Sequence, residues 1–166
     1  VTYKKNIDNS FEKKFEINKI DELEKMGAFL KLGEFDKLFN LVSLVNQSDP
    51  HQKYLADGEQ IFKYRYKSNK RNLDYLYNIA ISQILQRKST EAANTLIELL
   101  KLDKSNPNLY LAKAVVDIYN FNPRKAEKNI NLAGKFNNDQ NLYSTINSIK
   151  TISNIINFRI RSLINI

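Results

Sequence analysis

Apolar residues recur every three or four positions along most of the chain, the spacing that gathers them on one face of an α-helix. Between residues 20 and 50 this pattern predicts two helices, one ending at Gly33 and the next at Ser48. Their join is too short for anything but an antiparallel helical hairpin. Asp49 and Pro50 then supply a capping residue and a proline at the first helical position, which predicts another helix start.

The pattern is least regular over residues 51–70. Apolar spacing there suits a helix that continues to about residue 66, whereas Phe62, Tyr64 and Tyr66 alternate with basic residues as in an extended segment. We predict a helix and treat residues 51–70 as an irregular insert in the fold.

An internal repeat with a period of 34 residues follows the insert. Ten apolar positions of the first unit keep their apolar character in the second. They are Leu73, Leu76, Tyr77, Ala80, Ile81, Ile84, Ala92, Leu96, Leu99 and Leu102, which align with Pro107, Tyr110, Leu111, Ala114, Val115, Ile118, Ala126, Ile130, Ala133 and Phe136. Each unit has two apolar stripes separated by a polar break. Residues 71–104 and 105–138 are therefore predicted to be two stacked helix–turn–helix units.

The two ends of the chain complete the predicted organisation. Residues 1–19 read as a polar lead-in, and residues 139–166 as a long amphipathic helix that caps the repeats. The apolar stripe of this capping helix comprises Leu142, Ile146, Ile149, Ile152, Ile156 and Ile160. The sequence thus predicts an all-α fold with one domain over residues 20–166. Four glycines and three prolines are too few for a β-sandwich or barrel, and no apolar run approaches a membrane span.

The two units resemble the tetratricopeptide repeat (TPR) family, in which bulky and small residues alternate where helices cross closely. Leu76 with Ala80, and Tyr110 with Ala114, match the first helices of successive units. The second helices match through Ala92, Leu96, Leu99, Ala126, Ile130 and Ala133. The resemblance includes the hairpin 20–50 and implies a right-handed helical solenoid. Lys104 departs from it by replacing a proline, and Gln83 and Asp117 by replacing apolar residues.

In this family the first helices of the repeats line a concave groove that holds a partner peptide or helix. The resemblance implies that six residues lie near such a groove: Tyr77, Ile81, Ile84, Leu111, Val115 and Ile118. The alternative is that these side chains fill the core between repeats. Tyr77 and Ile81 stand where some members carry the lysine and asparagine that grip a carboxylate, so the resemblance favours a hydrophobic or amphipathic segment as the ligand.

The charge balance leaves a second function open. Lysine and arginine number 26 against 18 acidic residues, a net charge of +8. Five basic residues lie close together with Tyr64 and Tyr66 between them: Lys63, Arg65, Lys67, Lys70 and Arg71. Such a run suits nucleic acid or another polyanion. The alternatives are a solvated helix whose tyrosines pack inward and a low-GC genome, which enriches lysine, asparagine and isoleucine together.

The amino-acid composition gives little support for a catalytic or cofactor-binding site. Cysteine is absent and His51 is the single histidine, which excludes thiolate metal sites and thiol chemistry. The four glycines are scattered, so no phosphate-binding loop is formed. We expect no enzyme, no cofactor and no metal site, but a non-catalytic adaptor that binds another protein, with nucleic acid the less favoured partner.

Two further expectations concern assembly and location. The capping helix could pack against a second copy of the chain through Ile152, Ile156 and Ile160. The sequence starts at Val1 rather than methionine, which together with the missing cysteines favours a bacterial envelope protein without its leader over a cytoplasmic one.

Overall fold

The computed structural model describes residues 19–137, 145–147 and 149–150. Helices and the turns that join them make up this whole part of the chain, which confirms the predicted all-α class. An N-terminal helix is described over residues 19–32. It is followed by α2 (Phe35–Ser48), α3 (Lys53–Ser68), α4 (Leu73–Leu85), α5 (Ser89–Leu102), α6 (Pro107–Tyr119) and α7 (Pro123–Phe136). The insert is thus a regular helix, α3, and its extended alternative is wrong.

Asparagine side chains define where three of these helices begin. The side-chain oxygen of Asn72 accepts a hydrogen bond from the amide of Asp74 at the start of α4, and Asn106 does the same for Asn108 in α6. Asn122 caps α7 through the amide of Lys125. Each cap satisfies an amide that has no partner inside its helix. Asn72 and Asn106 occupy equivalent places in the two repeat units.

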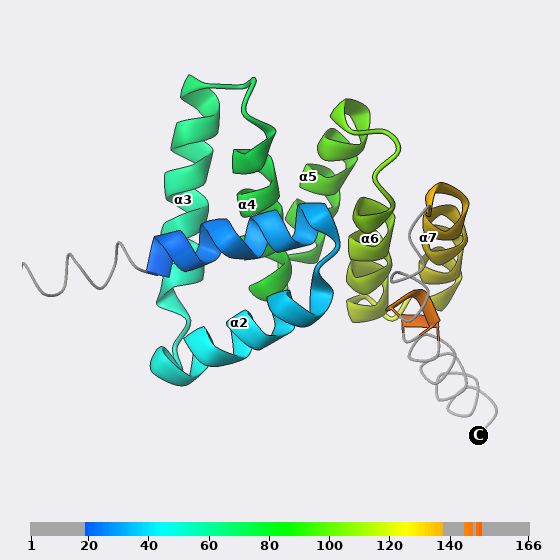
Figure 1. Cartoon of the computed structure of the whole chain (residues 1–166), viewed down its shortest axis with the longest axis horizontal. Coiled ribbons are helices and arrows are strands. Elements are labelled where there is room, and N and C mark those ends of the chain that lie inside the picture. Colours follow the sequence, from blue (N-terminus) through cyan, green and yellow to red (C-terminus); the bar gives the residue numbers. More distant parts are fainter. Residues whose placement is uncertain (1–18, 138–144, 148, 151–166) are drawn as a thin grey trace, which may run out of the picture.

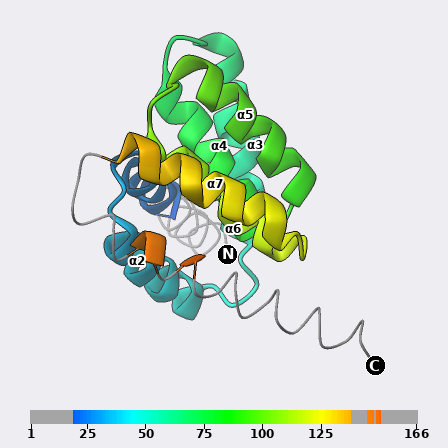
Figure 2. The same ribbon diagram turned by 90° about the vertical axis from the view of Figure 1, so that its right-hand side faces the viewer.

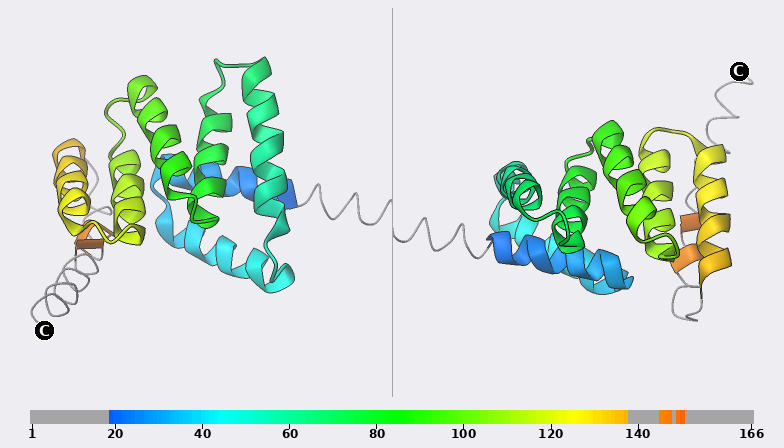
Figure 3. Two further views of the ribbon diagram at one scale, coloured as in Figure 1. Left: turned by 180° about the vertical axis from the view of Figure 1, so that it is seen from behind. Right: turned by 90° about the horizontal axis from the view of Figure 1, so that it is seen from above.

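Helices α3 to α7 form a row in which each helix packs against the next (Figures 1 and 3). The small residues expected at the crossings are fully buried: Ala80, Ala92, Ala114, Ala126 and Ala133. Because alanine carries a single methyl group, neighbouring helix backbones can approach closely there.

The hairpin formed by the N-terminal helix and α2 lies across this row instead of continuing it (Figure 1). Leu23 of the N-terminal helix contacts Gly58 of α3, and Gly27 contacts Asn78 of α4. At the hairpin turn Gly33, with φ of +74°, lies against Asn108 of α6. One helix therefore touches three members of the row.

The N-terminal helix is an integral part of the core. Leu23 and Met26 are fully buried and Leu30 is 2% exposed, and the three share one helical face. They belong to the same hydrophobic core as Tyr77 of α4 and Leu111 of α6. Burying a side chain of this size contributes about 1.5–3 kcal/mol.

The C-terminal part is described only in short helical pieces. Residues 145–147 and 149–150 lie near α6 and α7 (Figures 1 and 3), with Ile146 buried and Ile149 packed against the core. Residues 1–18 of the predicted lead-in lie outside the described residues, as do Leu142, Ile152, Ile156 and Ile160 of the capping helix and of the proposed zipper. Among the helices described, none has the length and apolarity to cross a membrane.

The glycine contacts of the N-terminal helix yield a stability prediction. A methyl group at Gly27 would collide with the side chain of Asn78, so Gly27→Ala should destabilise the fold by about 1–3 kcal/mol in urea unfolding. Gly134→Ala is the matched control, because a methyl group there meets no atom within 4 Å. The control should leave stability unchanged or raise it by up to about 1 kcal/mol. Equal effects of the two substitutions would contradict the close crossing at Gly27.

Candidate functional site

The six residues expected to line a groove are distributed between the core and its margin. Tyr77, Ile81, Ile84 and Leu111 are buried, with at most 7% of their surface exposed. Val115 and Ile118 are half-buried. The N-terminal helix reaches over α4 here, since the Lys31 ammonium lies 5.9 Å from the centre of the Tyr77 ring. These four side chains belong to the hydrophobic core of the structure.

The end of the N-terminal helix is held by two asparagines of α6. The Lys31 carbonyl accepts hydrogen bonds from the side-chain amides of Asn106 and Asn108, each at 3.1 Å. Carbonyls in the last turn of a helix lack intrahelical partners, so these two bonds terminate the helix. Asn106 thus caps the start of α6 and the end of the N-terminal helix together.

Tyr77 extends this junction into α5. Its hydroxyl donates to Asp103 at 2.7 Å and accepts from Asn106 at 2.9 Å. Burial and the bond to Asp103 both raise the pKa of Tyr77. The phenol therefore stays protonated and remains a donor at neutral pH.

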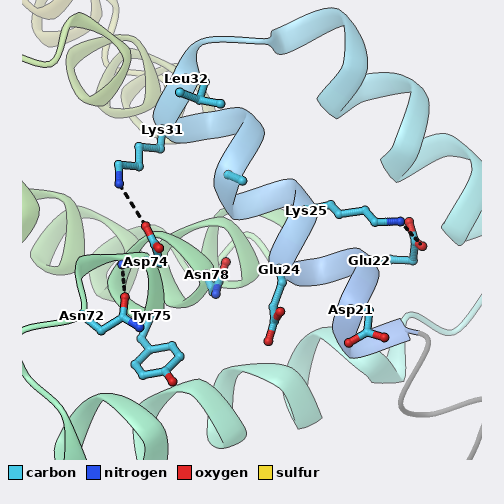
Figure 4. Close-up of a pocket in the computed structure, with 11 residues that line it drawn as sticks. Asp21, Glu22, Glu24, Lys25, Lys31, Leu32, Asn72, Asp74, Tyr75 and Asn78 are labelled. Carbon is cyan, nitrogen blue, oxygen red and sulfur yellow. Dashed lines mark hydrogen bonds and ion pairs between the residues drawn. The ribbon is translucent and has the colours of Figure 1, made fainter.

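A cavity of about 930 Å³ opens between the N-terminal helix and the first half of α4 (Figure 4). The N-terminal helix contributes Asp21, Glu22, Glu24, Lys25, Ala28, Lys31 and Leu32, and α4 with its cap contributes Asn72, Asp74, Tyr75 and Asn78. Four carboxylates and two ammonium groups belong to this lining, and a third cation, Arg65 of α3, pairs with Glu24.

Ion pairs join the walls of this cavity to one another and to α3. Lys31 pairs with Asp74 at 3.0 Å, and Arg65 of α3 pairs with Glu24 at 2.9 Å. Lys25 pairs with Glu22 at 3.1 Å on the N-terminal helix itself. Within the described residues, Asp21 has no ion-pair partner and is exposed.

Asn78 is the one cavity residue that is almost completely buried and polar. It is 4% exposed, lies against Gly27, and its amide lines the cavity (Figure 4). Its amide oxygen packs against Gly27, where the N-terminal helix and α4 cross.

The five basic residues proposed to bind polyanions have different environments in the structure. Lys63 pairs with Glu59 at 2.9 Å, while Arg65 pairs with Glu24 and lies over the Phe62 ring. Lys67, Lys70 and Arg71 are exposed at the end of α3 and in the turn after it. Tyr64 is 75% exposed, whereas Tyr66 donates to Glu98.

Glu59 forms a polar cluster that sequence reasoning missed. This fully buried carboxylate accepts from Gln83 at 3.0 Å and Gln86 at 3.1 Å, and pairs with Lys63 and Lys88, each at 2.9 Å. Burial alone would raise the pKa of Glu59, but the hydrogen bonds from these four side chains prevail and lower it from 4.5 to about 2. The cluster binds α3 to α4 and α5, and leaves no acceptor for a ligand.

Both polar departures from the family pattern acquire partners inside the fold. Gln83 also accepts from the Thr95 hydroxyl at 2.6 Å. Asp117 accepts from the Asn129 amide at 2.7 Å, and burial raises its pKa although that bond opposes the shift. These residues connect the two helices of their own repeat unit.

The other candidate functional residues do not form a cluster. His51 is exposed in the turn between α2 and α3. No group of three metal-ligating side chains occurs in the region that the structure covers. The cavity residues escaped sequence reasoning because they come from two segments that are at least 40 positions apart. The available signal was Asn78, an amide that interrupts the apolar run of α4.

Comparison with known proteins gives no match to a family model, a curated protein or a solved structure. The functional inferences below therefore rest on the residues of this chain.

The junction at Asn106 predicts an unequal effect of two similar substitutions. Asn106→Ala removes both a helix cap and the bond to Lys31, so it should cost about 2–3 kcal/mol in urea unfolding. Asn72→Ala removes only a cap and should cost about 1 kcal/mol. Equal losses would contradict a bridging role for Asn106.

The buried carboxylate predicts an acid-dependent stability. Because folding lowers the pKa of Glu59, its contribution is complete above pH 4.5 and is lost as the pH falls towards 2. Glu59→Gln should therefore destabilise the protein by about 3 kcal/mol at pH 7, with the difference shrinking below pH 4.5. Chemical unfolding between pH 2 and 7 measures this.

Glu91→Gln is the control for that experiment. Glu91 is exposed and lies 3.8 Å from the same lysine, Lys88, so its substitution should change stability by less than about 1 kcal/mol. A pH profile of Glu59→Gln that runs parallel to the wild type would refute the role of the buried carboxylate.

Proposed function

We propose that this chain is a non-catalytic protein-interaction module, built as a TPR-like, right-handed solenoid, whose open cavity receives a segment of a partner protein. The successive packing of α3 to α7 supports the solenoid. So do the equivalent caps Asn72 and Asn106, and the alanines buried at the helix crossings.

The cavity beside the N-terminal helix is the observation that carries this proposal. Its volume of about 930 Å³ falls at the upper end of the range for ligand pockets. Leu32 at its rim is 67% exposed, and Tyr75 adds an aromatic surface among the carboxylates. Aromatic side chains such as Tyr75 are enriched at protein–protein interfaces.

The proposed binding position differs from the one that the family resemblance implies. The N-terminal helix already covers Tyr77 of α4, where a partner helix was expected. A partner would instead contact the exposed flank of the N-terminal helix and the start of α4. This partner segment would bury apolar surface and would also form hydrogen bonds with the chain.

Site-directed photo-crosslinking tests this position. The chain has no cysteine, so Leu32→Cys can carry a thiol-linked photo-crosslinker at a single site. Illumination in a lysate of the source organism at about 0.5 M salt, where surface charges are screened, should attach one partner protein, identified by mass spectrometry. The control is Ile97→Cys on α5, which is 43% exposed and does not line the cavity.

Adducts that are absent, or that are the same from both positions, would refute binding at the cavity.

The exposed Lys67, Lys70 and Arg71 favour a second candidate function, contact with nucleic acid or another anionic surface. Nucleic acid that copurifies only at low salt would favour that candidate.

A further inference from the structure

We propose that the outward face of α7, together with Phe121 in the turn before it, binds an anionic lipid surface. This helix is the last of the row, and it crosses in front of the other helices in Figure 2. No residue of α7 lines the cavity beside the N-terminal helix. The inference therefore goes beyond the partner segment proposed for that cavity.

The first argument is a line of cations along α7. The buried residues of this helix form one face: Ala126, Asn129, Ile130 and Ala133. Arg124, Lys128 and Lys135 recur at helical spacing on the opposite face, and all three are exposed. The residue between them on that face is the neutral Asn131. The outward face of α7 is therefore cationic along most of its length.

These cations are available to an external anion. Within the described residues, none of the three forms an ion pair. In contrast, Lys63 and Arg65 of α3 are each paired with a glutamate. The helix α7 contains four basic residues and one acidic residue, so it contributes a net charge of +3 to the +8 of the chain. A surface with one dominant sign of charge attracts partners of the opposite sign.

The second argument is Phe121, which does not depend on the cations. Its side chain is 72% exposed and lies outside the hydrophobic core, and its φ of +54° falls in the left-handed region. Gly33 has the equivalent place, two residues before the second helix of its hairpin, with φ of +74°. Glycine suits this conformation, whereas a bulky side chain is strained in it. An exposed ring kept at a strained position indicates a role in binding.

A second aromatic side chain extends this surface. Tyr119, at the end of α6, is 42% exposed. The guanidinium of Arg87, from the turn between α4 and α5, lies 5.7 Å from the centre of the Tyr119 ring. Aromatic rings and cations thus occur together at the end of the molecule where α7 begins. This combination is typical of proteins that bind the surface of a membrane.

A lipid bilayer fits these features better than a nucleic acid does. A bilayer surface is wide and flat, so it can contact the convex outer face of a helix without a groove. Its anionic headgroups attract clustered lysine and arginine, and the headgroup region accommodates aromatic rings. Single-stranded nucleic acid is typically held in a positively charged groove. Neither of the cavities beside the N-terminal helix includes a residue of α7.

Fluorescence of the full chain with lipid vesicles tests the position of contact. The chain has no tryptophan, so Phe121→Trp introduces a single indole at the proposed site. Vesicles made of equal parts phosphatidylcholine and phosphatidylglycerol should move its emission to shorter wavelength, and phosphatidylcholine alone should not. The control is Tyr64→Trp on α3, a position that is 75% exposed beside the other basic residues, and its emission should not move.

Two charge-matched variants test the cationic face. One replaces Arg124, Lys128 and Lys135 by glutamine, and the other replaces the three exposed cations at the opposite end of the row: Lys67, Lys70 and Arg71. Each variant loses one arginine and two lysines. In sedimentation with the anionic vesicles at about 0.1 M salt, the α7 variant should bind at least about tenfold more weakly. The α3 variant should lose less than about threefold.

Phe121→Gly separates binding from folding. Because glycine suits a positive φ, this substitution should leave the unfolding midpoint in urea unchanged or raise it. It should also weaken binding to the anionic vesicles at least about threefold, because the ring is lost. A residue with a purely structural role would give the opposite result, with lower stability and unchanged binding.

Three outcomes overturn the inference. One is an equal loss of binding in the two charge variants, which would show a general attraction of charges. Another is an emission of the Phe121→Trp variant that does not respond to anionic vesicles. The last is a response of that variant to oligothymidine but not to vesicles, which would assign the face to nucleic acid. Crosslinking from Leu32 reports on the cavity alone, so its result stands apart from all three.

Discussion

The crossing of the N-terminal helix over the helical row is the contact on which the rest of the structure depends. A hairpin of this length could not bury both its faces alone, and the row would expose Tyr77 and Leu111 without it. Close approach requires Gly27 and Gly58, and the bonds from Asn106 and Asn108 fix where the helix stops. The cavity exists only because this helix stands beside α4.

Local structure could be predicted from the sequence, and its arrangement in space only in part. Apolar spacing and the 34-residue repeat located α4 to α7, because both signals arise from neighbouring residues. Position within the fold is decided by contacts such as Gly27 with Asn78, which join distant segments. For that reason the pattern of Tyr77 and Ile81 suits a groove and a core equally, since it does not reveal which other segment lies over them; both are buried in the structure.

Polar residues in the core also show the difference between what the sequence predicts and what only the structure reveals. Gln83 and Asp117 depart from the family pattern, and the structure gives each a partner: Glu59 for Gln83 and Asn129 for Asp117. The isolated sequence could identify the departure but not the partner, because Glu59 lies in the insert that had the weakest pattern. Asn78 differs from both, because its amide packs against Gly27 at the crossing of the N-terminal helix and α4.

The bond between Asn106 and Lys31 also bears on the order in which the protein is made. These residues are 75 positions apart, and the chain leaves the ribosome from its N-terminus. At about 5–20 residues per second, the N-terminal helix waits roughly 4–15 s for its terminal cap. During that interval Leu23, Met26 and Leu30 have no completed row to cover them. The N-terminal helix therefore completes its native contacts only after helices that are synthesised later, and its apolar face is the one that a chaperone would meet.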